Sequence, residues 1–396
     1  MLSSKRILIL VRSMEVCGGT QKVVAEISKQ FQKKKYYVCI NTLFYNKNDC
    51  YKKELENVKI RSVVTADKTN RLVKCLLLSN GRIASIFQFI SFWIITVINA
   101  GKYGIIIPQD DFSATILGII PKRHNQKTIW YLNYQLSQVI INTFKNHKDN
   151  KLSFGNVRYF IYKKAFNKIN NFAVWSKYNK IVVEKNIKRK ADLVYAGADL
   201  SKYLPISQLE KSRNEGRLNI LTIGILYPYR RYEDVIKTLY ILNNKGLKCN
   251  LTIVGKSDYS QKYLFFLKNL VAKYKLGKQI KFIEYLSDKN KYSEYLKANV
   301  FIFVNDGNTW GISVFEAVAC GIPVIITNNI GAVDLIDNKC GWIVNPHSPN
   351  EIALSIEQIY NEPNLVKQKT TNAIKNVQDL LTWKSFTNRL INLVKE

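Results

Sequence analysis

Several residue types are scarce in this 396-residue chain. It has three His, two Met, and 29 Asp and Glu against 60 Lys and Arg. Its seven cysteines are odd in number and widely spaced, and they form no Cys-x-x-Cys pair or Cys/His cluster. Such spacing supports neither a zinc site nor a disulfide framework, so no metal is expected. We expect mostly buried, reduced thiols in a cytoplasmic protein.

Long uninterrupted apolar runs are also missing. The opening residues, MLSSKRILILVRS, hold a short apolar run that ends at Arg12, which predicts a first strand and not a signal peptide. The most apolar segment, residues 83–100, carries no charge but is interrupted by Ser, Gln, Thr and Asn. It is only just long enough to cross a bilayer. We expect a buried or interface-lying helix, with a transmembrane span as the alternative.

The shortage of acidic residues gives a formal net charge of +31. A surface of this kind attracts nucleic acid, anionic lipid headgroups or phosphorylated ligands, although a lysine- and asparagine-rich coding bias explains the excess equally well. The basic residues form no long runs, which argues against a disordered nucleic-acid tail. The 23 Tyr and 18 Phe form no repeated stacking motif. We expect no specific nucleic-acid partner, and a basic nucleic-acid-binding protein is kept as an alternative.

The chain does contain a regular alternation of strand and helix patterns. The first half has strand patterns at 7–11, 37–44, 59–64, 104–108 and 127–132, with helix patterns at 21–31, 69–78, 83–100 and 112–119 between them. This alternation predicts parallel, doubly wound sheets. The charged, poorly periodic stretch 201–216 predicts a linker, after which the alternation restarts. We predict an α/β chain with two Rossmann-like domains, 1–200 and 201–380, facing across a cleft, and a C-terminal helix in 381–396 that returns to the first domain.

The stretch 301–328, FIFVNDGNTWGISVFEAVACGIPVIITN, reads as strand, polar turn, short helix, glycine and strand. The helix start would direct the backbone N–H groups of Gly311, Ile312 and Ser313 towards an anion. Glu316 follows one turn later on the same helix. A plain strand–helix–strand crossover with a surface glutamate is the alternative reading.

Other polar or glycine-rich turns follow predicted strands. Arg230 and Arg231 precede a helix, where two guanidiniums suit a diphosphate, with a solvated basic turn as the alternative. The pair Gly18-Gly19, the pair Asp110-Asp111 and Asn133 also come at the carboxyl ends of strands, which face the ligand crevice in this architecture. Ordinary tight turns and loops would explain the same residues.

In their order along the chain, these segments resemble the family 4 glycosyltransferases, the large retaining group with the GT-B fold. The family's Gly-Gly loop is matched by Gly18-Gly19-Thr20, and its "GRLxPxKG" loop by residues 224–231, GILYPYRR. Its "E-GFG-LPLLEAMACGxPVI" segment is matched by residues 308–325, NTWGISVFEAVACGIPVI. The "pGvD" turn and the "G.LV.P" strand are matched at 196–199 and 341–346. The resemblance covers nearly the whole chain and is strongest from 190 to 347.

The resemblance implies a nucleotide sugar, UDP- or GDP-linked, as co-substrate on the second domain, and no other cofactor. It implies that Glu316 holds the ribose hydroxyls, that Arg230 holds the diphosphate, and that the amides of Gly311 and Ile312 contact sugar or phosphate. These roles make chemical sense, because ribose hydroxyls suit a bidentate anionic acceptor and a leaving diphosphate suits fixed positive charge.

Three departures from the family pattern concern the site. Asn308 stands in place of the family's first glutamate, so it can hydrogen-bond sugar hydroxyls but adds no negative charge. Ile225 replaces an arginine, and Arg231 is the candidate for the missing cation. Asn133 stands where the family often has a histidine. A variant subfamily accounts for these changes, and weakened or lost activity is the alternative.

We therefore predict a hexosyltransferase of polysaccharide or glycan biosynthesis, acting with retention on a glycan or lipid-linked acceptor. The candidate catalytic residues are Glu316, Arg230 and Asn308, and the candidate nucleotide-sugar contacts are Gly18, Gly19, Arg231, Gly311, Ile312, Ser313 and Asn133. The basic surface and the apolar segment 83–100 make an anionic membrane, the inner face of the cell membrane, a further candidate partner. The sequence shows neither an epimerase acid–base set nor a lysine–pyridoxal signature, which argues against an epimerase or a phosphorylase.

Overall fold

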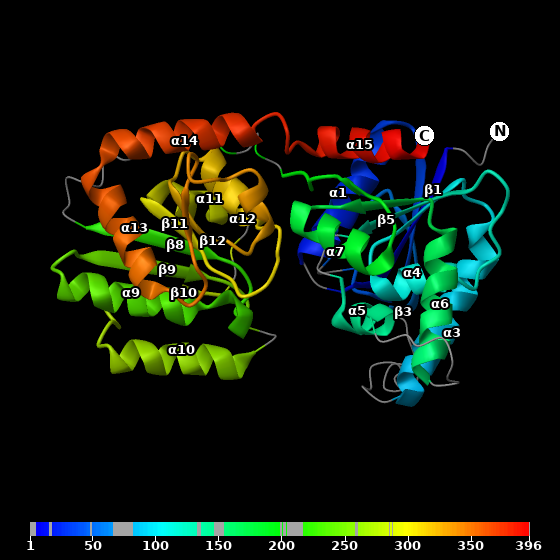
Figure 1. The fold of residues 1–396 in the computed structure, drawn as a ribbon, viewed down its shortest axis with the longest axis horizontal. Helices are drawn as coiled ribbons and strands as arrows, with labels where there is room; N and C mark the ends of the chain where they lie inside the picture. Colours follow the sequence, from blue (N-terminus) through cyan, green and yellow to red (C-terminus); the bar gives the residue numbers. More distant parts are fainter. Residues whose placement is uncertain are drawn as a thin grey trace. The chain divides into compact units, whose positions relative to one another are not determined.

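The structure, a computed structural model, describes residues 5–15, 18–47, 50–65, 82–132, 136–145, 154–198, 200, 203, 217–257, 260–284, 286 and 288–395. The chain divides into two compact units (Figure 1). Unit 1 comprises Met1–Gly197 together with Trp383–Glu396, and unit 2 comprises Ala198–Thr382. Each unit has its own parallel sheet and its own hydrophobic core.

Unit 1 is built on a seven-stranded sheet with the order β3-β2-β1-β4-β5-β6-β7. Its strands are β1 (Arg6–Met14), β2 (Tyr37–Tyr45), β3 (Lys59–Thr65), β4 (Ile105–Pro108), β5 (Lys127–Leu132), β6 (Asn171–Val174) and β7 (Ala191–Leu193). Its helices are α1 (Gly19–Lys33), α3 (Arg82–Ala100), α4 (Asp111–Leu117), α5 (Gln138–Lys145), α6 (Phe154–Lys168), α7 (Lys177–Ile187) and α15 (Trp383–Lys395). Residues Ile7–Leu10 of β1 are fully buried, because helices cover a parallel sheet and its central strands need apolar side chains throughout.

Unit 2 is built on a six-stranded sheet with the order β10-β9-β8-β11-β12-β13. Its strands are β8 (Leu218–Ile223), β9 (Cys249–Val254), β10 (Ile280–Ile283), β11 (Val300–Phe303), β12 (Val324–Thr327) and β13 (Trp342–Val344). Its helices are α9 (Tyr232–Asn244), α10 (Gln261–Lys273), α11 (Asp288–Lys297), α12 (Ile312–Ala319), α13 (Pro349–Asn361) and α14 (Pro363–Val377), with short 3-10 turns η2 (Pro228–Arg230) and η3 (Gly331–Asp334).

The predicted α/β class with two doubly wound parallel sheets is confirmed. The predicted helix at 69–78 lies outside the described residues, as does most of the predicted linker at 201–216. The last helix of unit 2 ends at Val377. The segment beyond it leaves the helix, and the carbonyl of Leu381 accepts a hydrogen bond from the backbone N–H of Ala198.

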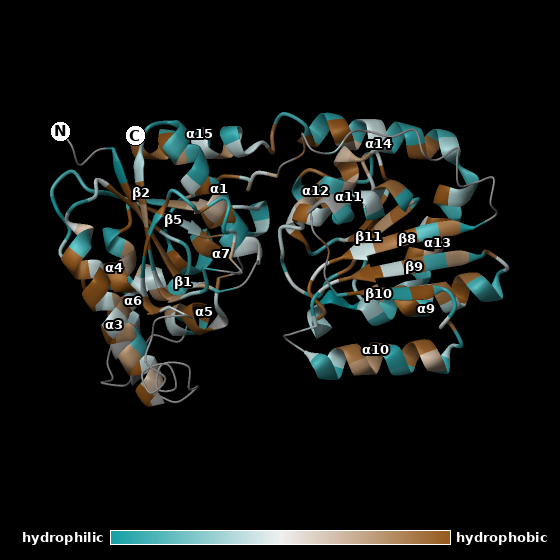
Figure 2. Cartoon of the chain, turned by 180° about the vertical axis from the view of Figure 1, so that it is seen from behind, coloured by the Kyte–Doolittle hydropathy of each residue, from teal (hydrophilic) through white to brown (hydrophobic). Residues whose placement is uncertain are grey.

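The described cysteines, at positions 39, 50, 249, 320 and 340, are all buried, which confirms for these five the predicted burial. Within the described part of the chain, α3 is the one helix that is long and apolar enough to cross a bilayer by length and composition. It packs against β2 and β3, and the side chains of Phe92 and Thr96 are fully buried. Figure 2 shows the apolar colouring of α3 and of the strands.

Candidate active site

The strand order of unit 2 reverses between β8 and β11. These two strands are parallel neighbours, and the chain continues from β8 to β9 on one side and from β11 to β12 on the other. Ligands of doubly wound sheets bind at such a switch point, outside the carboxyl ends of the strands. The loops that follow β8 and β11 are therefore where a binding site is expected in this unit.

The start of α12 lies at this switch point. Gly311 caps the helix with φ +79° and ψ 50°, a left-handed conformation that favours glycine. The hydroxyl of Ser313 donates to the carbonyl of Ile223 at 3.3 Å, which ties the first helical turn to the end of β8. The first N–H groups of an α-helix have no intrahelical acceptor, and the helix dipole favours an anion there. Gly311, Ile312 and Ser313 thus offer the backbone donors that the sequence predicts.

Arg230 ends the η2 turn and lies beside the last residue of β11. Its guanidinium carbon is 4.2 Å from the ring centroid of Phe303. A Cβ added to Gly224 would lie 2.6 Å from Nη2 of Arg230, so glycine at 224 leaves the space that this guanidinium occupies. Among the residues that the structure describes, Nε and Nη1 of Arg230 have no hydrogen-bond partner, although both atoms are buried. Buried charged donors without an acceptor are costly, so this position favours an anionic ligand.

Arg231 is placed differently. Its backbone is left-handed with φ +50°, and its side chain turns towards acidic residues. Nη1 lies 2.8 Å from Glu233, and Nε lies 3.1 Å from Asp234 and 3.8 Å from Asp306. Its charge is already balanced by these carboxylates, so it fixes the turn before α9. Arg230, rather than Arg231, is the cation with unmet hydrogen-bonding capacity.

Glu316 lies on α12 with 9% of its surface exposed. Nζ of Lys291 is 2.7 Å from one carboxylate oxygen and 2.6 Å from the other, and the hydroxyl of Tyr295 is 2.9 Å from the second. Burial and the Glu316 charge raise the pKa of Tyr295 well above its ordinary value, so this phenol stays a donor. A carboxylate has about four acceptor positions, so Glu316 retains capacity for further hydroxyl groups.

Sequence reasoning missed Lys291 and Tyr295. Both lie on α11, four residues apart, and residues at this spacing share one helix face. The sequence offers one signal for these residues. A lysine and a tyrosine stand four residues apart on the helix that precedes the strand leading into 301–328. It could be recognised only with the knowledge that α11 packs next to Glu316.

Asn308 belongs to the loop between β11 and α12 and is 8% exposed. Its side-chain amide donates to the carbonyl of Asn329 at 3.4 Å, and the neighbouring carbonyl of Thr309 accepts from the backbone N–H of Gly331 at 2.7 Å. Two hydrogen bonds thus join this loop to the segment after β12. Asn308 is held at the same sheet edge as Arg230 and the start of α12.

The remaining candidates belong to unit 1 or are not described. Gly18 caps α1, and Gly19 is its first residue, at the carboxyl end of β1. Asp110 caps α4, where its carboxylate accepts from the backbone N–H groups of Ser113 at 2.7 Å and Arg12 at 2.6 Å. Burial raises the pKa of Asp110 despite these bonds. Asn133 lies outside the described residues. The structure thus brings seven of the predicted residues to one edge of unit 2: Arg230, Arg231, Asn308, Gly311, Ile312, Ser313 and Glu316.

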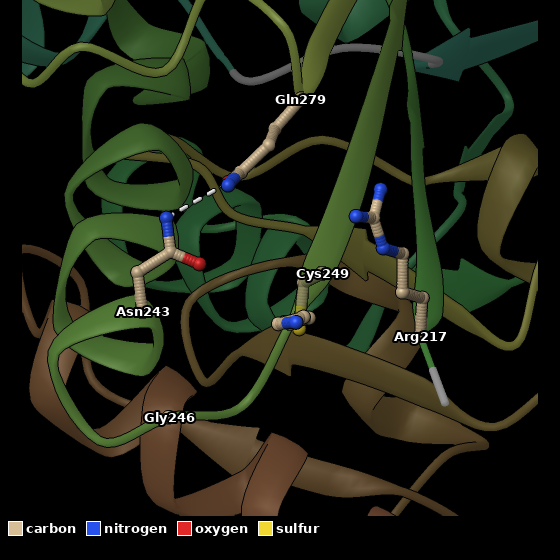
Figure 3. A pocket seen from close by; sticks show the side chains of 6 residues that line it. Arg217, Asn243, Gly246, Cys249 and Gln279 are labelled. Carbon is tan, nitrogen blue, oxygen red and sulfur yellow. Dashed lines mark hydrogen bonds between the residues drawn. The ribbon is translucent and has the colours of Figure 1, made fainter. Parts of the chain in front are cut away.

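A cavity of about 250 Å³ lies elsewhere in unit 2 (Figure 3). It lies at the starts of β8, β9 and β10, and so at the edge of the sheet opposite the candidate site. Its lining includes Arg217, Lys248 and Cys249, and the amide of Asn243 donates to Gln279 at 2.8 Å beside it. Within the described ranges, no group of three His, Cys, Asp or Glu residues could hold a metal ion.

The sequence of unit 2 matches a known family. Residues 207–376 match the family model described as glycosyl transferases group 1. This match confirms the prediction of a glycosyltransferase-type enzyme domain in the second half of the chain. Over 223 residues the chain is 27% identical to a "Probable sucrose-phosphate synthase" of Thermosipho melanesiensis, covering 54% of this chain and 50% of that protein. The chain spans half or less of the length of the first curated relatives that it matches.

Solved structures match the whole chain. HepE of Anabaena, in complex with UDP and glucose, covers 98% of this chain and 99% of its own, with 16% identity and a TM-score of 0.75. A sucrose-phosphate synthase of Thermosynechococcus elongatus covers 98% of both chains, with 17% identity and a TM-score of 0.76. At these identities the likeness shows the fold alone, which is the two-domain α/β GT-B fold.

Proposed function

We propose that the protein is a retaining hexosyltransferase of family 4, which moves a hexose from a UDP- or GDP-sugar to a glycan or lipid-linked acceptor. The observation that carries the proposal is the guanidinium of Arg230, whose Nε and Nη1 are buried and lack partners among the described residues. It lies at the switch point of a unit whose sequence matches glycosyl transferases group 1. HepE, a protein of the same fold, binds UDP and glucose, which supports a nucleotide-sugar donor here.

In this proposal, each site residue of unit 2 has a separate role in binding the donor or in stabilising the leaving diphosphate. Arg230 binds the diphosphate and stabilises the charge that grows on it as the sugar–phosphate bond breaks. The N–H groups at the start of α12 add a second source of positive potential. Glu316, held by Lys291 and Tyr295, accepts hydrogen bonds from the ribose hydroxyls. Asn308 hydrogen-bonds the transferred sugar without adding charge. Positioning and electrostatic stabilisation of the leaving diphosphate supply the catalysis.

On the acceptor side, we assign the glycan or lipid-linked acceptor to unit 1, and Gly18, Gly19 and Asn133 remain candidate contacts of the nucleotide sugar. No resident metal or cofactor is part of the proposal, in which the nucleotide sugar acts as co-substrate. We place the protein in the cytoplasm, at the inner face of the cell membrane, because the chain combines a net charge of +31 with an apolar α3.

The donor is tested by thermal unfolding in the presence of UDP- and GDP-sugars and of the free nucleotides. A ligand that binds only the folded state raises the melting temperature as its concentration increases, so one nucleotide series should do so. Arg230→Met should then weaken kcat/KM for that donor by about 10- to 100-fold, since a charged hydrogen bond contributes about 1.5–3 kcal/mol. Glu316→Ala should abolish donor turnover.

Arg217→Met is the matched control, because Arg217 lies in the same unit at the opposite edge of the sheet. It should leave donor binding and turnover unchanged. Full turnover by Glu316→Ala, or equal losses in the Arg230 and Arg217 variants, would contradict the assignment of the site.

A further inference from the structure

Helix α3 carries an apolar face that is open to solvent. The side chains on this face are between 42% and 66% exposed, and they are Ile83, Ile86, Phe87, Ile90, Ile94 and Ile98. Their spacing of one, three or four residues places them on one side of an α-helix. A contiguous exposed apolar face of this kind is typical of a surface that binds a partner or a membrane.

The opposite face of α3 is fixed to the sheet of unit 1. The amide of Asn41 in β2 donates to the carbonyl of Ile95 at 3.2 Å, and the guanidinium of Arg12 donates to Gln88 at 2.9 Å. Phe92 and Thr96 are fully buried beneath the helix. A transmembrane orientation would break both hydrogen bonds and remove these side chains from the core. The helix therefore lies along the surface of unit 1, with only one face available to an apolar phase.

The positive charge of the protein is concentrated in the same unit. Unit 1 has 37 Lys and Arg against 12 Asp and Glu, a net +25, whereas unit 2 has 23 against 17, a net +6. From Phe112 to Val183 the sequence has twelve Lys and Arg and a single acidic residue. Unit 1 therefore combines an exposed apolar face with a strongly cationic surface.

Basic residues also lie close to the apolar face. At the C-terminal end of α3, Lys102 is exposed, and the side chain of Arg123 lies over Gly101, where an added Cβ would be 2.8 Å from its Nε. The helix α6, which packs on α4 as α3 does, adds exposed Phe160 together with exposed Lys163 and Lys164. Apolar side chains flanked by lysine and arginine are suited to the boundary between acyl chains and anionic headgroups.

We propose that unit 1 docks on an anionic phospholipid bilayer through the exposed face of α3, with the helix lying parallel to the membrane surface. A second copy of the chain could also cover the face, but it would bring two surfaces of charge +25 together. In an anionic bilayer, the acyl chains can take up the apolar face while the headgroups attract the basic residues. Docking would bring unit 1 to a lipid-linked acceptor, and this part of the inference rests on the proposed function. Its test needs neither donor nor acceptor.

The test is flotation of the full chain with phosphatidylglycerol–phosphatidylcholine vesicles and with phosphatidylcholine vesicles. The wild-type protein should bind the anionic vesicles, and binding should weaken as salt is raised, because headgroup attraction is screened. Ile90→Glu/Ile94→Glu should weaken binding at least about tenfold, because two apolar side chains leave the acyl boundary. Tyr178→Glu/Ile181→Glu on α7 is the matched control, with the same charge change at exposed positions of the same unit.

The control should lose less than about threefold, since it changes charge but not the docking face. Melting temperature and nucleotide binding by unit 2 should match wild type in both variants, and Ile86→Ser/Ile98→Ser provides a second test if the first variant folds poorly. Equal losses in the two double variants, or equal wild-type binding to neutral and anionic vesicles, would overturn the proposal. A dimer that the α3 substitutions dissociate, without vesicle binding, would assign the face to a second copy. Because vesicle binding is read without sugar transfer, its failure is distinct from failure of the proposed function.

Discussion

At the scale of single residues, the site depends on which charges are already paired. Arg230 and Arg231 are neighbours in sequence with the same side chain, yet Arg231 contacts three carboxylates while two nitrogens of Arg230 have no partner in the described structure. The local sequence pattern does not distinguish the two, and only the family resemblance assigns the diphosphate to Arg230. The backbone of Arg231 is left-handed, and its side chain points towards α9. This difference in direction makes Arg231 a structural residue and leaves Arg230 available to a ligand.

Lys291 provides a prediction at this scale. Its ammonium group holds the Glu316 carboxylate at 2.6–2.7 Å, so Lys291→Met should leave Glu316 less well oriented for ribose. We expect KM for the nucleotide sugar to rise about tenfold with kcat little changed, as for an interaction made equally in ground and transition states. Steady-state kinetics measures this split.

Lys291→Arg should recover most of the affinity, because it keeps a cation at the position. Lys297→Met is the control on the same helix, since Lys297 pairs with Glu294 and its side chain is 63% exposed. An unchanged KM in Lys291→Met would show that Glu316 needs no support from α11.

At the scale of secondary-structure elements, α15 shows how a segment distant in sequence completes a unit. This helix contacts α1, β5 and β6, and Phe386 is fully buried with its ring 5.0 Å from that of Tyr131. A Cβ on Gly197 would lie 2.7 Å from the ring of Trp383, so glycine leaves room for the helix to enter unit 1. The sequence predicts that this helix returns to the first domain, and the fold shows which of its elements the helix contacts.

Phe386→Ala should therefore destabilise unit 1 by about 3–5 kcal/mol, the usual cost of emptying a buried aromatic site. Hydrogen exchange should speed up in β5, β6 and α1 and stay unchanged in β8 and β9 of unit 2. Phe265→Ala is the control, because Phe265 is 67% exposed on α10. Equal loss of protection in both sheets would mean that α15 does not belong to unit 1 alone.

At the scale of the whole molecule, buried weak acids link stability to pH. Burial raises the pKa of the Cys249 thiol to about 12 from an ordinary 9.0, and burial with the Glu316 charge does the same for Cys320. Burial likewise raises the pKa of the Tyr232 hydroxyl to about 12. A folded-state pKa above the unfolded one stabilises the fold below the unfolded value, and this contribution is lost as pH rises towards the folded value.

The melting temperature should accordingly fall as pH is raised from 9 to 12. At pH 10, each of the two thiols should lower the free energy of unfolding by on the order of 1 kcal/mol relative to neutral pH. These groups should make little difference between pH 6 and 8, where they are protonated in both states. Cys249→Ala/Cys320→Ala should flatten the alkaline limb of a thermal-unfolding series. A wild-type melting temperature that stays constant up to pH 11 would contradict the burial of these thiols.

The sequence by itself determined the α/β class, the parallel strands and the glycosyltransferase-type segment. The class and the strands follow from local features, namely continuous apolar runs for buried strands and helix periodicity, whereas the glycosyltransferase-type segment follows from the resemblance to a known family. Glu316, Gly311 and Arg230 could be named in advance because they fall at fixed offsets from such local patterns.

Only the tertiary structure decided how those residues are used. Pairing of charges, as in Lys291 with Glu316 and Arg231 with Asp234, joins side chains from different elements or depends on one backbone turn, and periodicity does not encode it. The same holds for α3, whose uncharged segment 83–100 has apolar side chains on every side of the helix. Packing on β2 and β3 buries one face of the helix and leaves the other exposed, because a helix can bury only the side that meets its sheet.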